Sequence, residues 1–363
     1  MPGLKKAGVA NHLLSLCEGL IGRGWEVHVA YLRGPAEMER EFEQAGCTVS
    51  CIGIERTMDP IGLARLIRYI TKNDFDIIHT HLFRGDVYGS IAGILTSNTP
   101  IISTKHNNAP YLESLPYRWL HSLTAAISDE IITISDFLKD FHSENTFSRE
   151  EKFTTIHYGL DLKPFQQVNQ DDVREIRSTL PDDSQILIGT VCRLVNVKGI
   201  DILLDSLPRV IDANPQVHLL IVGDGPNREE LERQCHTLGL ENNVTFAGFR
   251  SDIPELMHAF DLFVLPSRRE GFGLVLLEAM AAGTPIVATR TSAIPEVVVD
   301  NETGKLATVG DSEDLSEKII STINNPNTME NMGQAGLERV ENSFTMEETV
   351  SNTEILYKKY INA

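Results

Sequence analysis

Short apolar segments alternate with longer segments of helical periodicity along the chain. From Trp25 to Leu32 every second residue is apolar, as in a strand with one buried face. Between Val9 and Ile21 the apolar residues follow helical spacing instead, and Gly22 and Gly24 then offer a helix end. Four further strands are predicted in this half: Val49–Ile54, Asp76–Thr80, Pro100–Thr104 and Glu130–Ile134. This alternation predicts a parallel sheet with helices on both faces.

The alternation is interrupted once, between Asp161 and Asp172. Here the sequence is polar and contains Pro164, which predicts a linker. Strands are predicted again after it, at Gln185–Cys192, Val217–Gly223, Asn243–Gly248, Asp261–Pro266 and Pro285–Thr289. From Asp311 onward the pattern is almost entirely helical.

These patterns predict an α/β fold of two Rossmann-like, doubly wound domains that face each other across a cleft. The first is expected at residues 1–165 and the second at residues 166–344, followed by a terminal segment, 345–363. Ligands of such sheets bind beyond the carboxyl ends of the strands. Residues that directly follow strands are therefore the candidates for a site.

Composition and charge narrow the classes of partner. The 363 residues are 42% hydrophobic and 23% charged, as in an ordinary globular protein. A net charge of −19 argues against nucleic acid, since its phosphates require a basic face. Residues 1–165 hold 16 Lys and Arg against 20 Asp and Glu, and the remainder holds 16 against 31. Only the first half is therefore suited to an anionic membrane surface.

Cysteine usage and the chain start predict a cytoplasmic protein. The five cysteines are odd in number and lack metal-ligand spacing: Cys17, Cys47, Cys51, Cys192 and Cys235. Cys47 and Cys51 could begin a zinc site, but no second pair follows them. No run of about 18 apolar residues exists to span a membrane. Met-Pro-Gly-Leu-Lys-Lys also lacks the apolar segment of a signal peptide.

The strongest motif is the run from Ser267 to Gly283, directly after a predicted strand. Gly271 and Gly273 allow close backbone approach, and the amides at a helix start carry partial positive charge, which suits a phosphate. Glu270 and Glu278 are eight residues apart, about 12 Å if that span is helical. One carboxylate at each end could then hold the ribose and the hexose of a nucleotide sugar. By spacing alone, a buried helix with an acidic first turn explains the run equally well.

A second motif places two cations between a strand and a helix. Arg193 and Lys198 are five residues apart and could neutralise a diphosphate, Arg193 as a fork and Lys198 as a point charge. The alternative is a pair of solvated surface cations, but their place after a strand favours a ligand. Two glycine turns, Gly223–Pro226 and Gly3–Gly8, are weaker motifs of the same kind.

Together these motifs resemble the retaining glycosyltransferases of family 4, which have the GT-B fold. The matching segments are Glu270–Pro285, Arg193 with Lys198, Gly223–Pro226, Ile134-Ser135 and Gly159–Asp161. The resemblance covers essentially the whole chain. It implies that the last helix, from Met346 to Ile361, crosses back to pack on the first domain.

The resemblance also implies a role for each candidate residue. At the donor diphosphate it places Arg193, Lys198 and the backbone of Phe272, Gly273 and Leu274. It places Glu278 at the ribose, Arg250 with Phe249 at the base, and Gly8 as a closing contact from the first domain. The catalytic pair is His106, beside the reacting sugar carbon, and Glu270, on the donor sugar.

The implied reaction transfers a sugar from a nucleotide-sugar co-substrate with retention of anomeric configuration, by same-face attack. The leaving phosphate would help to deprotonate the acceptor, and the cations and helix start would stabilise its charge. The scheme needs no metal and no other cofactor. Family frequency favours UDP, and the type of enzyme favours a glycan or lipid-linked acceptor of cell-envelope polysaccharide. The enzyme would work in the cytoplasm, with peripheral contact to the inner membrane face through the first domain.

One departure from the family pattern concerns the start of the chain. Family members begin with a central strand that leads into the glycine loop, whereas Met1 already lies in that loop. Either the chain begins upstream of this Met, or the first domain lacks a core strand and is less stable for it. The loop also carries Lys5, Lys6 and Ala7 where a second glycine is common.

Three other functions fit parts of the sequence. His79 and His81 alternate in a strand, as in some metal-dependent hydrolases, although only His106 lies near as a third ligand. The favoured interpretation places both histidines on the acceptor side with Arg84 and Asp86, but for His79 a place in the core explains the pattern at least as well. UDP-sugar epimerases share the two-domain architecture. A sugar-nucleotide binding protein without catalysis is the third alternative.

Overall fold

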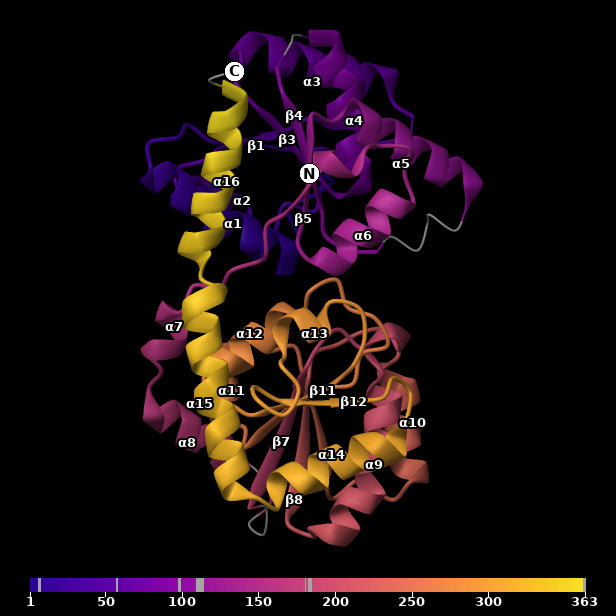
Figure 1. Cartoon of the computed structure of the whole chain (residues 1–363), viewed down its shortest axis with the longest axis vertical. Helices are drawn as coiled ribbons and strands as arrows, with labels where there is room; N and C mark the ends of the chain where they lie inside the picture. The colour runs from indigo at the N-terminus through magenta and orange to yellow at the C-terminus, as the bar shows by residue number, and fades with distance from the viewer. Residues whose placement is uncertain are drawn as a thin grey trace. The chain divides into compact units, whose positions relative to one another are not determined.

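The computed structural model describes residues 1–5, 8–56, 58–96, 99–108, 114–179, 181 and 185–361. The chain folds into two compact units, and the boundary between them lies close to residue 160 (Figure 1). The N-terminal unit joins Met1–Gly159 to Met346–Ala363, and the C-terminal unit is Leu160–Thr345. Among the described helices, none is both long and apolar enough to span a membrane.

All strand pairs of the N-terminal unit are parallel, but they form two separate sheets. β3 (Ile78–His81), β4 (Ile101–Lys105), β5 (Glu130–Thr133) and β6 (Phe153–Thr155) pair in that order. Among the described residues, β1 (His28–Tyr31) and β2 (Thr48–Cys51) pair only with each other. Every residue of β4 and β5 is buried, as expected for strands covered on both faces. Within the described residues no strand precedes the first helix.

Helices cover both sheets of this unit. They are α1 (Gly8–Gly22), α2 (Glu39–Gln44), α3 (Pro60–Asn73), α4 (Leu82–Thr96), α5 (Leu115–Ile127), α6 (Asp136–Glu144), a short 3₁₀ helix (Glu150–Lys152) and α16 (Met346–Ile361). The start of α3 is fixed locally, because the Asp59 carboxylate accepts a hydrogen bond from the Gly62 amide at 2.8 Å.

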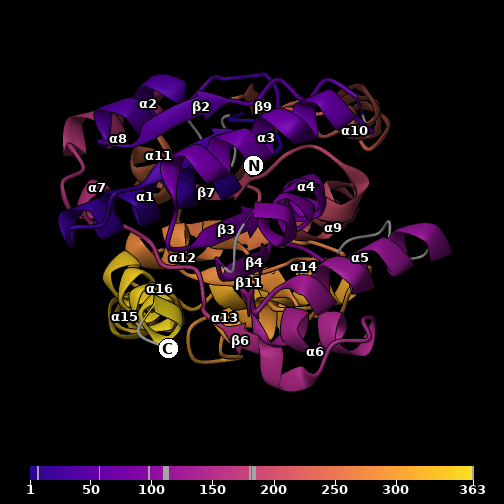
Figure 2. The same ribbon diagram turned by 90° about the horizontal axis from the view of Figure 1, so that it is seen from above.

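The last helix, α16, packs beside α1 (Figure 1 and Figure 2). Val350, Leu356 and Tyr357 join the apolar core that α1 shares with β1. At the rim, Arg23 and the Trp25 indole both donate to Glu354, at 2.9 and 3.1 Å. The chain therefore ends as part of the N-terminal core, as the resemblance implies.

The C-terminal unit has one six-stranded parallel sheet, in the order β12-β11-β10-β7-β8-β9. The strands are β7 (Ile186–Val191), β8 (Val217–Val222), β9 (Val244–Gly248), β10 (Leu262–Leu265), β11 (Ile286–Thr289) and β12 (Lys305–Ala307). The chain winds outward from β7 in one direction and from β10 in the other. The two strands at this reversal, β7 and β10, are neighbours, and doubly wound sheets bind ligands in the crevice outside the carboxyl ends of such strands.

The helices of this unit pack on both faces of the sheet. They are α7 (Lys163–Gln166), α8 (Gln170–Ser178), a 3₁₀ helix (Asn196–Lys198), α9 (Ile200–Ala213), α10 (Arg228–Thr237), α11 (Ile253–Ala259), α12 (Leu274–Ala281), α13 (Ile294–Val297), α14 (Ser312–Ile323) and α15 (Pro326–Ser343). All residues of β8 and β10 are buried between them.

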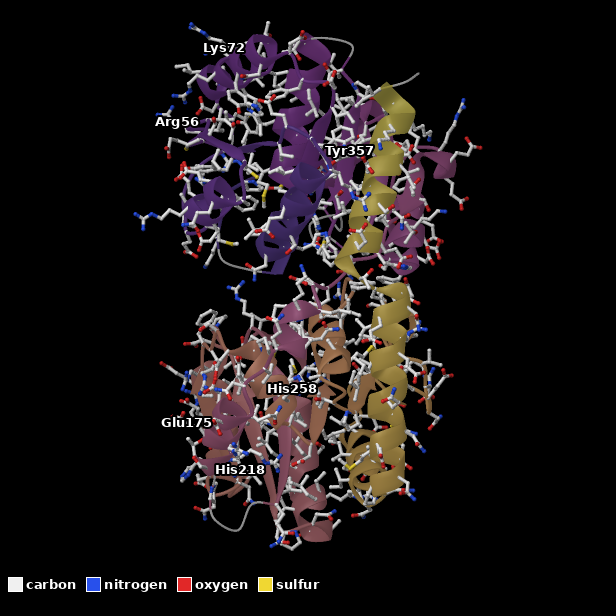
Figure 3. The ribbon with its side chains drawn as sticks, turned by 90° about the vertical axis from the view of Figure 1, so that its left-hand side faces the viewer. Arg56, Lys72, Glu175, His218, His258 and Tyr357 are labelled. Carbon is white, nitrogen blue, oxygen red and sulfur yellow. The ribbon has the colours of Figure 1, made fainter. Side chains whose placement is uncertain are left out.

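The linker prediction for Asp161 to Asp172 is wrong in its structural detail. α7 occupies part of this segment, and Phe165 is buried in the C-terminal unit. His258 of α11 bonds the Phe165 carbonyl through Nε2 at 2.8 Å (Figure 3). Phe165 is the buried side chain of this mainly polar segment, and composition alone does not show that it packs into the C-terminal unit.

Candidate functional site

Two loops of the C-terminal unit meet at the carboxyl edge of its sheet. One follows β7 and the other follows β10, and these strands pair through Ile188 with Leu262. The Arg268 amide donates to the Val197 carbonyl at 2.8 Å. Gly199 is left-handed, with φ at +68°, and a Cβ there would lie 2.1 Å from the Pro266 carbonyl oxygen. The two loops are therefore held in contact, and only glycine fits at position 199, where they pass each other.

This packing brings Lys198 onto Glu270. The ammonium Nζ donates to Glu270 Oε1 at 2.5 Å, and the two side chains are 20% and 12% exposed. One residue of the cation motif, Lys198, thus contacts one residue of the glycine motif, Glu270. The pair is enclosed enough to interact strongly and open enough to meet a ligand.

Arg193 lies on the β7 loop with an exposed side chain. Its guanidinium forms no hydrogen bond or ion pair with the part of the chain that the structure describes. The loop itself is held by the glycine turn after β8, because the Leu194 amide donates to the Asp224 carbonyl at 3.0 Å. A Cβ at Gly225 would lie 2.3 Å from the Leu194 carbonyl oxygen. The weak Gly223–Pro226 motif therefore serves to position the Arg193 loop.

The helix after this crevice begins without a side-chain cap. α12 starts at Leu274, and its N-cap Gly273 is left-handed, with φ at +90°. Its first-turn amides thus have no capping side chain among the described residues, and they carry the positive end of the helix dipole. Phe272 is buried and fixes the turn through an edge contact with the Phe344 ring. Such a start is a ready site for an anionic oxygen.

The two glutamates of the motif sit in different surroundings. Glu270 lies in the turn before α12, so the helical separation of about 12 Å expected from the sequence does not apply. Glu278 lies in the second turn of α12, and burial raises the pKa of its carboxyl to about 7. Within the described residues no cation pairs with it. Glu278 is therefore part protonated at neutral pH and suited to hydrogen bonds with hydroxyl groups.

Arg250 follows β9, two strands away from β7. Its guanidinium forms a two-point pair with Asp252, with Nε to Oδ1 at 2.8 Å, which raises the pKa of Arg250 and lowers that of Asp252. The side chain is thus held in one orientation beside Phe249, which is 70% exposed. Its role at a nucleotide base remains a prediction.

In the N-terminal unit, His106 follows β4 and is buried in a cluster of aromatic and histidine side chains. Its Nε2 lies 3.1 Å from His81 Nδ1, and its Nδ1 bonds the Tyr158 hydroxyl. Burial and the neighbouring charges of His12, His79 and Lys105 hold the pKa of His106 well below its usual range. The imidazole is therefore neutral at pH 7. Its catalytic role remains a prediction.

The acceptor-side placement of Asp86 is wrong. Asp86 is buried, accepts from Lys105 Nζ at 2.6 Å, and accepts from Thr80 and Ser103 hydroxyls at 2.7 and 2.9 Å. A carboxylate so fully engaged serves the packing of α4 on the sheet. Arg84 likewise donates to the Arg56 carbonyl. Alternation in the sequence shows which face of a strand a residue lies on. It does not show whether other groups of the protein already bond its polar atoms.

The histidine pair of β3 is also engaged. His79 bonds the Tyr357 hydroxyl at 2.5 Å and the Thr104 hydroxyl at 2.6 Å, and burial lowers its pKa to about 3. Within either unit, the described residues bring no three His, Cys, Asp or Glu side chains together as metal ligands. The metal-hydrolase alternative has no support in this geometry.

The structure describes only part of the first glycine loop. Gly8 is the first residue of α1, whereas Lys6 and Ala7 lie outside the described residues. The closing role of Gly8 remains a prediction.

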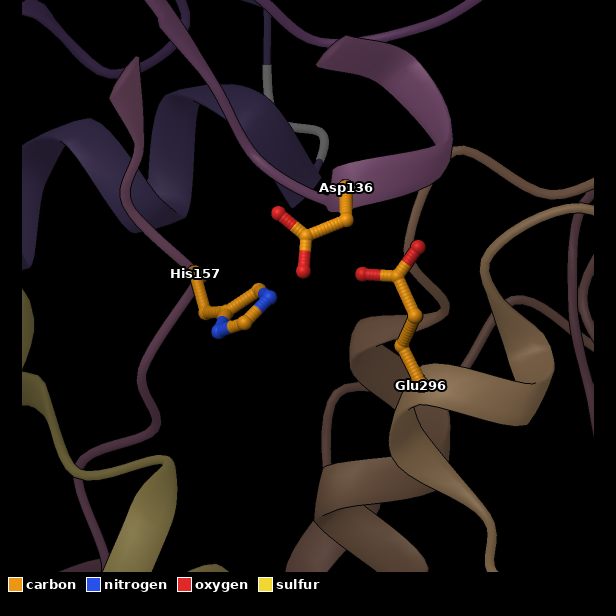
Figure 4. A group of neighbouring side chains, drawn as sticks. All are labelled: Asp136, His157 and Glu296. Carbon is orange, nitrogen blue, oxygen red and sulfur yellow. The ribbon is translucent and has the colours of Figure 1, made fainter. Parts of the chain in front are cut away.

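Sequence analysis missed two polar side chains near the end of the N-terminal sheet. Asp136 begins α6 and accepts from the Thr155 hydroxyl at 2.6 Å. His157 follows β6, and its carbonyl accepts from the Thr349 hydroxyl at 3.0 Å. Figure 4 shows the two side chains turned toward each other, while Glu296, also drawn, belongs to the C-terminal unit. The sequence offered one signal for these two residues, which is that each follows a strand.

Two protein families match this chain. The family described as Glycosyl transferases group 1 matches residues 171–339, which contain the crevice. The family described as Glycosyltransferase Family 4 matches residues 7–163. The chain belongs to these glycosyltransferases.

Relatives across the full length support this membership. The capsular polysaccharide biosynthesis glycosyltransferase CapM of Staphylococcus aureus is 26% identical over 353 residues, covering 95% of this chain and 92% of CapM. A UDP-Gal:alpha-D-GlcNAc-diphosphoundecaprenol alpha-1,3-galactosyltransferase of Escherichia coli is 26% identical, covering 85% and 81%. This glycosyltransferase therefore aligns with whole enzymes and not with a single shared domain.

Solved structures show the fold to be GT-B. Anabaena HepE in complex with UDP and glucose aligns with a TM-score of 0.88 at 24% identity, covering 98% of this chain and 97% of that one. WaaG, involved in lipopolysaccharide biosynthesis, aligns with a TM-score of 0.76 at 16% identity, covering 98% of each. The predicted fold class is confirmed.

Proposed function

We propose that this glycosyltransferase moves a sugar from a UDP-sugar to a glycan or lipid-linked acceptor in polysaccharide or glycoconjugate synthesis, with retention of configuration. The contact between Lys198 and Glu270 carries the proposal, because it joins the cation loop to the loop before α12. The crevice at this strand reversal is where doubly wound sheets bind nucleotides.

The donor diphosphate fits between three sources of positive charge. Arg193 has an exposed guanidinium for bidentate contact, and Lys198 offers a point charge beside Glu270. The uncapped start of α12 adds backbone amides. Glu270 holds the Lys198 ammonium at the crevice through Oε1. Its other carboxylate oxygen can accept a hydrogen bond from a sugar hydroxyl.

The choice of UDP rests on two relatives. Solved complexes of HepE contain UDP, and the Escherichia coli relative is named for UDP-Gal. Glu278, with its raised pKa, suits the vicinal hydroxyls of a ribose. Arg250 and Phe249 after β9 would face the base.

The same groups suit a retaining transfer. As the bond to the anomeric carbon breaks, charge accumulates on the leaving phosphate, and the Arg193–Lys198 pair with the α12 amides stabilises it. The acceptor attacks the same face and gives its proton to that phosphate. Neutral His106 would bond a sugar hydroxyl without adding charge, through an Nε2 that exchanges its contact with His81 for the sugar. The scheme needs no metal ion or further cofactor.

A donor screen tests the assignment. Thermal unfolding is measured with UDP-, GDP- and ADP-sugars, and a donor present at 100 times its Kd should stabilise the folded state by about 2.7 kcal/mol. We expect UDP-sugars to raise the midpoint and the other two series to leave it unchanged. The anomeric configuration of the product is then read by NMR. An inverted product contradicts retention, and an isomerised UDP-sugar formed without acceptor would indicate an epimerase.

We also propose that the enzyme works at the inner membrane face through its N-terminal unit. α5 exposes Leu115, Tyr117, Trp119 and Leu123, which are 48 to 69% exposed, and the Phe147 ring lies 5.1 Å from that of Trp119. Arg118 stands exposed among them. Aromatic and basic side chains on one helix are typical of interfacial contact with anionic lipid.

Vesicle sedimentation tests this contact. The Trp119→Ser, Leu123→Ser variant should bind phosphatidylglycerol vesicles about tenfold more weakly than the wild type, because it removes apolar area from the interface. Ile355→Ser, at an exposed apolar position on α16, serves as the matched control and should bind normally. Equal binding by all three proteins would contradict the proposal.

A further inference from the structure

Two histidines and a tyrosine meet at the carboxyl edge of the four-stranded sheet in the N-terminal unit. His81 ends β3, His106 follows β4, and Tyr158 lies three residues beyond β6. The sheet contact continues past β6, because the Ile156 amide donates to the carbonyl of the last residue of β5 at 2.9 Å. Ile156 and Tyr158 are buried and His157 between them is less so, which continues the alternation of a strand. This alternation turns the Tyr158 side chain into the interior, where it meets His106.

Both ring nitrogens of His106 have a partner in this group. Nδ1 bonds the Tyr158 hydroxyl, and Nε2 lies 3.1 Å from His81 Nδ1. Each of the three side chains is only 5 to 8% exposed. A neutral imidazole has one protonated and one bare nitrogen, and its neighbours decide which nitrogen carries the proton. Tyr158 and His81 therefore set the tautomer of His106.

The contact between Tyr158 and His106 has a favoured direction. Burial raises the pKa of the Tyr158 hydroxyl, so the phenol keeps its proton at neutral pH. A bare imidazole nitrogen is a far stronger base than a phenol oxygen, since imidazole takes up a proton at about pH 6.5. The favoured arrangement therefore has the phenol O–H donating to Nδ1, which leaves the proton of neutral His106 on Nε2.

The neighbouring rings hold this arrangement in place. Burial, and then the charges of His79 and His106, keep the pKa of His81 well below its usual range, so its ring is neutral and Nδ1 can accept. His12 of α1 packs on the Tyr158 ring, with ring centroids 3.9 Å apart. The cavity that these side chains line measures about 20 Å³, which is room for one water molecule but not for a ring to turn.

The backbone that carries Tyr158 is held independently of its hydroxyl. The Thr349 hydroxyl of α16 donates to the His157 carbonyl at 3.0 Å, directly before Tyr158 in the chain. The Ile156 amide is bonded to β5. Removing only the Tyr158 hydroxyl should therefore leave this segment in place and take away the partner of His106 Nδ1.

We propose that Tyr158 is a positioning residue for the transfer reaction: its hydroxyl donates to His106 Nδ1, fixes the proton of His106 on Nε2, and aims that N–H at the donor sugar. In the free enzyme the same N–H rests on His81 Nδ1, and the sugar takes the place of His81 when it binds. His106 then donates to a hydroxyl oxygen of the sugar and adds no charge. The inference rests on the proposed function of His106 and deepens it.

Two phenylalanine variants test the Tyr158 hydroxyl. Tyr158→Phe should lower kcat about tenfold, because His106 loses a buried hydrogen bond that fixes its orientation. The Kd of the UDP-sugar, measured by calorimetry, should change by less than about twofold, since the diphosphate contacts remain. Tyr357→Phe is the matched control (Figure 3). It removes another buried hydroxyl, which bonds His79 at 2.5 Å, and should leave kcat unchanged.

Nitrogen NMR of protein with labelled histidine supplies a readout that a merely structural role would not move. In the wild type, His106 should carry its proton on Nε2 and show a hydrogen-bonded Nδ1. The Nδ1 resonance should move downfield in Tyr158→Phe, as for an unbonded nitrogen, and should stay in place in Tyr357→Phe. The wild type alone reveals the tautomer, so this measurement tests the proposal even where Tyr158→Phe folds poorly.

Two results would overturn the inference. One is a wild-type His106 with its proton on Nδ1, and the other is equal kcat in Tyr158→Phe and Tyr357→Phe. A His106→Ala variant separates this failure from that of the proposed function. With His106→Ala inactive and Tyr158→Phe fully active, only the positioning role is wrong. With wild-type kinetics in His106→Ala, His106 takes no part in transfer, and its proposed function fails together with the role of Tyr158.

Discussion

Replacing Lys198 by alanine is expected to lower kcat/KM for the nucleotide-sugar donor about 100-fold. The ammonium stabilises charge that develops on the leaving phosphate, and removing one such group typically costs a factor of about 100 to 1,000 in rate. Both donor affinity and turnover should fall, since the diphosphate is charged before and during transfer. Steady-state kinetics with a UDP-sugar, combined with donor titration by calorimetry, measures the two effects separately.

Two further variants separate chemistry from structure in this test. Lys318→Ala removes a lysine from α14 and should leave the kinetics unchanged, since Lys318 pairs only with Asp314 of its own helix in the described structure. Glu270→Gln keeps the shape of the Lys198 partner and removes its charge. In a double-mutant cycle, the Lys198→Ala and Glu270→Gln effects should be clearly non-additive. Wild-type kinetics in Lys198→Ala would show that the diphosphate binds elsewhere.

Replacing Glu278 by glutamine is expected to stabilise the C-terminal unit at pH 8 and to have little effect at pH 4.5. The folded-state pKa of Glu278 is raised from 4.5 to about 7. Below pH 4.5 the carboxyl is neutral in both states and burial carries no charge penalty. Between pH 4.5 and 7 the unfolded state ionises first, so the wild type loses stability as pH rises. Above pH 7 the full penalty is present, about 3 kcal/mol.

Urea unfolding at pH 4.5, 6, 7 and 8 measures this difference. The stability gained by Glu278→Gln should grow with pH and level off above pH 7. Glu338→Gln, at an exposed position of α15, is the matched control and should show no such trend. The same Glu278 variant should bind donor more weakly if its carboxylate holds the ribose. A pH-independent difference would show that burial does not hold this carboxyl neutral.

The N-terminal sheet shows where sequence reasoning met its limit in the first unit. The departure from the family start was visible in Met1 and Gly3, but it left two alternatives open. In the part of the chain that the structure describes, β1 pairs with β2 and β3 pairs with β4, in two separate sheets. Which strands pair with one another depends on segments that lie far apart in sequence. Local pattern carries no information about it.

The buried polar groups illustrate a second limit. The sequence placed Asp86 on the acceptor side, and it left His79 open between that side and the core. The structure pairs Asp86 with Lys105, and His79 with the Tyr357 hydroxyl from the opposite end of the chain. A buried polar group needs a partner, but the sequence does not say whether that partner is a ligand or another side chain.

By itself, the sequence determined the alternating α/β architecture, because apolar periodicity reflects which faces of each element are buried. It also predicted a phosphate site at Arg193, Lys198 and the glycine turn at 271–273, because cations and close backbone approach directly after a strand suit a phosphate, and this role stays a prediction. Only the tertiary structure decided that Lys198 contacts Glu270, that the pKa of Glu278 is raised, and that Asp86 is closed to ligands. Each depends on groups more than ten residues apart meeting in a low-dielectric interior, and such meetings are set by strand order and packing.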